Sequence, residues 1–165
     1  MKPLIDTVIH LLAYNDLTGE FVWKNRQTNR VAIGSVAGSK NRKDGYIRIG
    51  ISKKIYAAHR LAFIFMTGDW PPEDVDHIDG NKANNSWNNL RLASDQVNAQ
   101  NLRRAKSSNK SSGLLGSFFN KSVNRWMSMI MIDGKNKYLG LFDTPEQAHE
   151  AYLTQKRKHH LGCTI

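Results

Sequence analysis

The chain has 165 residues, 40% of them hydrophobic, and its 24 lysines and arginines outnumber its 14 acidic residues, for a formal charge of +10. No apolar run approaches the roughly 18 residues that a membrane span requires. Asp6 interrupts the apolar core that a signal peptide would need. The single cysteine excludes an internal disulfide and a multi-cysteine zinc site. We therefore expect a cytoplasmic protein without a membrane partner, whose charge attracts the phosphates of nucleic acid.

The N-terminal part of the chain predicts mainly β-structure. Residues 11–24 predict a hairpin, because apolar residues flank a centre of turn-forming side chains. Residues 31–36 predict a short strand. In residues 45–51 isoleucines alternate with other side chains, which indicates a strand with one apolar face. Residues 55–56 are expected to form its return strand.

Two short helices are expected on either side of a polar loop. Residues 59–67 are largely apolar and stop at Gly68, which indicates a buried helix with a glycine near its C-terminal cap. Residues 76–91 are rich in asparagine and predict a loop. Residues 94–104 predict a second helix, with its N-cap at one of the first two positions.

A basic segment then leads to a second small unit. Residues 106–112 contain no apolar side chain and predict a flexible cationic linker. Asp133-Gly134 predicts a hairpin turn. A helix should begin after Thr144, with Pro145 at its first position and Gln147 completing a capping box. Three strands are expected between the linker and this helix, at residues 114–119, 126–132 and 137–142.

The strongest chemical signal is Asp76-His77, set before a turn at Gly80. Hydrolysis of a phosphodiester needs a base that activates water and a metal ion that stabilises phosphoryl charge. His77 is the candidate base, since the ordinary pKa of histidine suits proton transfer near neutral pH. Asp76 offers a hard oxygen to a divalent cation, and Asn98 an amide oxygen. Asn89 is the candidate for bonding the loop backbone.

Other interpretations of this stretch are open from residue types alone. Asp-Gly beside asparagines is also a common hairpin signature. A calcium loop fits less well, because alternating oxygen ligands and a glutamate at the twelfth position are missing.

The whole pattern resembles a known family, the HNH endonucleases, especially those of bacteriophages, which include homing endonucleases. It is carried by Asp76-His77-Ile78-Asp79-Gly80-Asn81-Lys82, Asn85, Asn89-Leu90-Arg91, Gln96-Val97-Asn98 and Asn101. The resemblance implies a ββα-metal fold over roughly residues 10–104.

Carried over by position, His77 is the general base, Asn89 fixes the loop and orients His77, and Asp76 with Asn98 holds one Mg²⁺, or Mn²⁺, per site. Asparagine stands where the last letter of the family name implies histidine. The implied reaction is hydrolysis of DNA to 5′-phosphate and 3′-hydroxyl ends.

Residues 113–160 resemble the DNA-binding domain of plant ethylene-response factors, through Gly116-Ser117, Arg125-Trp126, Asp133-Gly134-Lys135, residues 138–144 and Ala148 to Tyr152. In that family one face of a three-stranded sheet enters the major groove and the other packs on a helix. By position, Trp126, Ser128 and Ile130 would face the helix, and Met127, Met129 and Met131 the DNA. A register shifted by one, with the methionines in the core, is the alternative.

We thus expect an α+β protein with three parts: an HNH nuclease domain with N-terminal β-hairpins (1–105), a basic linker (106–112), and a sheet-and-helix DNA-binding domain (113–165). Its partner would be double-stranded DNA, bound by a monomer or homodimer, and homing is the preferred biology. The expected DNA contacts, each with a solvated basic surface as its alternative, are Arg60, Arg91, Arg103, Arg104, Lys106, Lys110, Asn120, Lys121, Arg125, Lys135, Lys137 and Tyr138. A non-cleaving DNA-binding regulator and a restriction or toxin nuclease are the rival functions.

Overall fold

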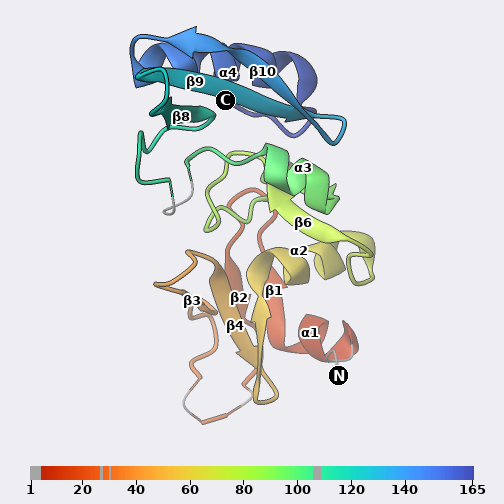
Figure 1. Ribbon diagram of the computed structural model, residues 1–165. Helices are drawn as coiled ribbons and strands as arrows, with labels where there is room; N and C mark the ends of the chain where they lie inside the picture. The colour runs from red at the N-terminus through yellow and green to blue at the C-terminus, as the bar shows by residue number, and fades with distance from the viewer. Residues whose placement is uncertain (1–4, 27, 30, 106–108) are drawn as a thin grey trace. The chain divides into compact units, whose positions relative to one another are not determined.

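The computed structural model describes residues 5–26, 28–29, 31–105 and 109–165. These residues form small antiparallel sheets and four α-helices (Figure 1). The chain divides into two compact units, of which the first ends at Ser94 and the second begins at Asp95. The domain boundary expected within 106–112 stays a prediction, and residues 106–108 lie outside the described part. Nowhere in the described ranges is a helix long and apolar enough to cross a membrane.

The first unit begins with helix α1 (Ile5–Leu11) and a hairpin of β1 (Leu12–Tyr14) and β2 (Phe21–Trp23). The hairpin confirms the prediction for residues 11–24, whereas α1 was not anticipated. Gly19, at φ +76°, provides the left-handed conformation that the turn requires.

A three-stranded sheet follows, made of β3 (Ser39–Lys40), β4 (Ile47–Ile51) and β5 (Lys54–Ala57). The predicted strand at 31–36 is wrong. Gly34 at φ +82° turns the chain there, and Val36 makes only an isolated bridge to β2.

Helix α2 (Ala58–Thr67) confirms the buried helix and its glycine cap, since Gly68 is left-handed and its N–H donates to the Ile64 carbonyl at 2.9 Å. Leu61 and Ala62 are fully buried in the core of the first unit, together with isoleucines of β4 and Phe21 of β2. The core therefore joins the N-terminal hairpin, the sheet and α2 into one support for the segment that follows.

That segment contains β6 (Asp74–His77), a 3-10 turn η1 (Trp87–Asn89) and β7 (Leu90–Ala93). Strands β6 and β7 pair antiparallel, with Asp76 opposite Arg91 and His77 opposite Leu90. The asparagine-rich loop thus leaves one strand and returns on its neighbour, which places both its ends at the candidate site.

The second unit contains α3 (Asp95–Gln100), β8 (Ser117–Asn120), β9 (Arg125–Ile132), β10 (Lys135–Phe142) and α4 (Pro145–His159). Its sheet has the order β10-β9-β8, and α4 lies along it (Figure 1). The α3 helix is shorter than the predicted 94–104, because the chain beyond it bonds the C-terminal region: the Leu102 carbonyl accepts from Lys156 Nζ.

Local signals in the second unit are confirmed. Asp133 and Gly134 both have positive φ, as a tight hairpin turn requires. Thr144 and Gln147 form the capping box at the start of α4. Ser128 and Ile130 are buried while Met131 is 58% exposed, so the sheet has the predicted facing and the shifted register is wrong.

Candidate active site

The paired strands β6 and β7 fix the Asp76 carboxylate. Arg91, directly opposite, donates from Nη2 at 2.8 Å and from Nε at 3.1 Å to the same oxygen, Oδ2. Asp76 is 14% exposed at its side chain and Arg91 24%, so the pair is partly shielded from water. Arg91 therefore orients the carboxylate, and its expected contact with DNA stays a prediction.

His77 ends β6 and is 2% exposed. Its Nε2 lies 3.1 Å from Asn85 Oδ1. The rings of His59 and Tyr46 pack beside it, with centroids 5.1 Å and 5.8 Å away. The imidazole is thus held on several sides by polar and aromatic groups of the first unit.

Burial decides the charge of both histidines in this cluster. Desolvation lowers the pKa of His77, although the hydrogen bond that the imidazole donates to Asn85 and the charges of Asp79 and Asp76 act in the opposite direction. Desolvation, with smaller contributions from His77, Arg60 and Arg48, lowers the pKa of His59 to about 3. A lowered pKa favours the neutral imidazole of His77, which is the form that a general base requires.

Asn89 makes the bonds that a brace of the loop requires. Its Oδ1 accepts from the Asp79 N–H at 2.9 Å, and its Nδ2 donates to Asp79 Oδ1 at 2.9 Å and to the Asn84 carbonyl at 2.8 Å. The Asn89 carbonyl also accepts from the Ile78 N–H. One side chain therefore joins the two ends of the loop, while its role in catalysis stays a prediction.

Asp79 is a second centre of this loop that sequence reasoning missed. Its carboxylate accepts from the Asn81 N–H and from the side chains of Asn84 and Asn89. Burial alone would raise the pKa of Asp79, but these hydrogen bonds outweigh it and lower the pKa. Asn85 and His59 were also given no catalytic part, because no local spacing signals their approach to His77.

Asn98, the expected second metal ligand, lies on α3. It belongs to the second unit, whereas Asp76 belongs to the first. Their joint role in holding a cation stays a prediction.

The expected arginine contacts have different surroundings. Arg60 lies 3.6 Å from the Asp74 carboxylate and donates to the carbonyls of Pro71 and Glu73. Arg103 donates to the Thr164 carbonyl at 3.1 Å within the second unit. Arg104 is exposed, and Lys106 lies outside the described residues.

In the sheet of the second unit, the strand register shows on which face of the sheet each residue expected to contact DNA lies. Tyr138 pairs with Met129, and Asn120 with Arg125, on the face away from α4. Lys135 and Lys137 instead pair with Ile132 and Ile130, whose side chains are buried. Most of the expected contacts here are exposed, namely Lys121, Arg125, Lys135, Lys137 and Tyr138, whereas Asn120 is half-buried.

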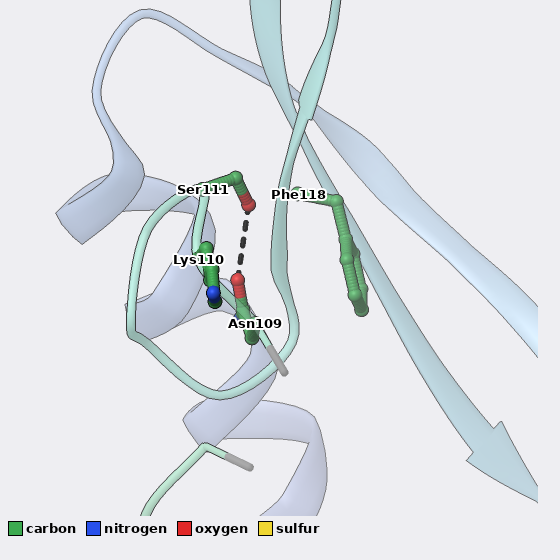
Figure 2. Close-up of a pocket in the computed structure, with 4 residues that line it drawn as sticks. All are labelled: Asn109, Lys110, Ser111 and Phe118. Atoms are coloured by element: carbon green, nitrogen blue, oxygen red, sulfur yellow. Dashed lines mark hydrogen bonds between the residues drawn. The ribbon is translucent and has the colours of Figure 1, made fainter. Parts of the chain in front are cut away.

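Lys110 lines a pocket of about 450 Å³ with Asn109, Ser111 and Phe118. Figure 2 shows Ser111 bonded to Asn109, with Lys110 between them in sequence and Phe118 on the neighbouring strand. The pocket combines a cation, polar groups and an aromatic ring that is 43% exposed. Such a lining is compatible with the expected phosphate contact of Lys110 and does not by itself select a ligand.

Comparison with known proteins gives a family match at the candidate site. The model of a family described as "HNH endonuclease" matches residues 56–100, which include Asp76, His77, Asn89 and Asn98. Protein 3.8 of Escherichia phage T7 is 34% identical over 52% of this chain and 69% of its own length. DNA endonuclease I-HmuI of Bacillus phage SP01 is 45% identical over 36% of this chain, but this covers only 37% of that protein.

A solved structure described as "DNA binding and cleavage by the HNH homing endonuclease I-HmuI" is also similar. Its sequence is 25% identical to this chain. The match covers 92% of this chain and 88% of the solved chain, with a TM-score of 0.43.

Proposed function

Because this chain belongs to the HNH endonucleases, a family of DNA-cleaving hydrolases, we propose that it hydrolyses DNA phosphodiesters with His77 as the general base. The observation that carries this assignment is the buried imidazole of His77, held by Asn85 at the end of β6 and next in sequence to the oriented carboxylate of Asp76. A base held in one orientation and uncharged at neutral pH can take a proton from an attacking water.

The other residues of the loop have supporting parts in this proposal. Asn89 ties together the two ends of the loop and so fixes the end of β6, where His77 lies. Arg91 holds the Asp76 carboxylate in one position through two N–H donors. Both contacts reduce the motion of the groups that must meet the scissile phosphate.

The side chains proposed for the metal fit a hard divalent cation. Asp76 offers a carboxylate that keeps some exposure, and Asn98 offers an amide oxygen, which are donor types that Mg²⁺ and Mn²⁺ accept. When bound, one such ion would stabilise the negative charge on the phosphate and on the leaving 3′ oxygen.

We propose that the second unit extends the contact with duplex DNA, as an ethylene-response-factor-like module would. Its exposed Lys121 and Arg125 and its charged turn at Lys135 support this role. Two weakly binding units in one chain gain affinity through effective concentration. Site-specific cleavage by a phage homing enzyme is the biology that we favour.

The test is cleavage of supercoiled plasmid by the full chain with Mg²⁺, compared with His77→Ala. We expect nicked or linear product from the wild type and a loss of about 100-fold or more in the variant, the usual contribution of a general base. His159→Ala, an exposed residue near the end of α4, is the control and should cleave at the wild-type rate.

Equal cleavage by the wild type and His77→Ala would refute the role of His77. Binding without cleavage by either protein, on any DNA tested, would instead favour a non-cleaving regulator. Chelation of the divalent ion should abolish cleavage and leave folding, measured by circular dichroism, unchanged.

A further inference from the structure

Asn85 is the polar partner of the candidate base, and it is almost wholly buried. Its exposure is 1%, and that of His77 is 2%. The Oδ1 of Asn85 and the Nε2 of His77 lie 3.1 Å apart. A polar contact this well buried is costly to lose, because water cannot replace the missing partner.

The amide of Asn85 has one favoured orientation. Its Nδ2 lies 3.3 Å from the Ala83 carbonyl, which can only accept a hydrogen bond. This bond directs Oδ1 toward His77, and an amide oxygen can only accept. The hydrogen of the neutral imidazole must therefore be on Nε2, which leaves the lone pair of the ring on Nδ1.

The N-terminal hairpin holds the backbone on which Asn85 sits. Tyr14 of β1 donates from its hydroxyl to the Asn85 carbonyl at 2.8 Å. The Trp87 N–H donates to the Asp16 carbonyl, also at 2.8 Å. Gly19 passes so close that a Cβ there would lie 2.3 Å from Asn85 C and Ser86 N. The hairpin lies outside residues 56–100, so the family match does not include it.

We propose that Asn85 is a positioning residue that selects the Nε2–H tautomer of His77, and that hairpin β1–β2 holds Asn85 in place for this task. The inference rests on the proposed function of His77 as the base. In the reaction, Nδ1 accepts a proton from water while the water oxygen forms its bond to phosphorus. The bond from phosphorus to the 3′ oxygen breaks, and that oxygen keeps the electron pair and is protonated by solvent.

The first test reads the tautomer directly and needs no cleavage. Long-range ¹H–¹⁵N spectra of the full ¹⁵N-labelled chain, at about pH 8 where an ordinary histidine is neutral, distinguish the two ring nitrogens. Signals lost in His77→Gln identify His77. We expect the Nε2–H form in the wild type and in Asn85→Asp, which keeps an acceptor, and a mixture of both tautomers in the matched variant Asn85→Leu, which has none.

The second test is the single-turnover cleavage rate of the same proteins. Asn85→Leu should lose about 10- to 100-fold, by analogy with residues that orient metal-ligating histidines, and Asn85→Asp should recover most of that loss. Tyr14→Phe should show a smaller loss with partial tautomer mixing. Leu17→Ala, at the 77% exposed tip of the hairpin, should match the wild type.

The outcomes separate the two proposals. A wild-type tautomer in Asn85→Leu, or the Nδ1–H tautomer in the wild type, would refute the inference. If Asn85→Leu does not fold, the other two variants test the inference. The Nδ1–H tautomer in Asn85→Asp would refute it, and so would a single tautomer in Tyr14→Phe. An inactive wild type with the expected tautomers would overturn the proposed function and leave the assignment of Asn85 intact.

Discussion

At the scale of single residues, the candidate site depends on polar groups that are buried and satisfied by one another. Asp79, Asn85 and Asn89 each bond the backbone or side chains of the loop, and His77 packs against His59 and Tyr46. Such a network specifies one arrangement, because breaking any member leaves a buried polar group without its partner. The same burial lowers the pKa of both His59 and His77.

His59 gives a prediction for the pH dependence of stability. Well above its ordinary pKa of 6.5, the folded and unfolded forms of His59 are both neutral, so it contributes no dependence. As the pH falls from there toward 3, where the folded pKa lies, the unfolded state binds a proton that the folded state does not. The free energy of unfolding therefore falls by at most about 1.4 kcal/mol per pH unit from this group.

The test compares the wild type with His59→Gln by urea unfolding between about pH 4 and about pH 6, a window that lies between these pKa values. Trp23, Trp70 and Trp87 in the first unit provide the fluorescence signal. The slope should be shallower in His59→Gln, while Ile49→Val, which removes buried volume without a titrating group, should keep the wild-type slope. An unchanged slope in His59→Gln would show that the folded protein protonates His59 normally.

At the scale of elements, the function depends on close approaches between strands, turns and helices. The antiparallel pairing of β6 and β7 aligns Asp76 with Arg91, and the β1–β2 turn supports the asparagine loop. In the second unit the β8–β10 sheet packs on α4, and Gly116 marks the contact. A Cβ at Gly116 would lie 2.1 Å from the ring of Tyr152.

Gly116→Ala should therefore destabilise the second unit more than Gly113→Ala does. Both glycines have nearly the same left-handed conformation, at φ +67° and +68°, but nothing lies within 4 Å of a Cβ at Gly113. Gly113→Ala should cost about 1 kcal/mol from backbone strain, and Gly116→Ala clearly more, because the Tyr152 ring must move. Thermal unfolding of both variants checks this, and equal losses would mean that the helix shifts freely away from the sheet.

At the scale of the whole molecule, the formal charge of +10 is the property on which the proposed binding to DNA would depend. Because bound phosphates release counterions, DNA affinity should fall linearly with salt on logarithmic axes. Lys121→Gln, an exposed residue of the second unit, should reduce that slope by about 1 if it contacts phosphate.

Fluorescence anisotropy of a labelled duplex between low and physiological salt measures the slope. Lys53→Gln, in the exposed turn between β4 and β5, is the control of equal charge change and should leave the slope nearly unaltered. The same reduction in both variants would mean that the net charge, rather than a contact at Lys121, governs binding.

The sequence by itself determined the local features: the β1–β2 hairpin, the cap at Gly68, the capping box at Thr144, and the Asp76-His77 pattern of a nuclease family. Each depends on residues close together in the chain, whose propensities or spacing are visible without the fold. The strand expected at 31–36 failed because neighbouring segments and Gly34 set its path.

Tertiary structure alone decided what surrounds His77. The approach of Asn85, His59 and Tyr46 to His77 joins segments far apart in sequence. The pairing of Arg91 with Asp76 depends on the β6–β7 register. The hydrogen bond from Tyr14 to the Asn85 carbonyl depends on the packing of the hairpin. No periodicity encodes such contacts, because burial and hydrogen bonding between distant segments arise only when the core brings them together.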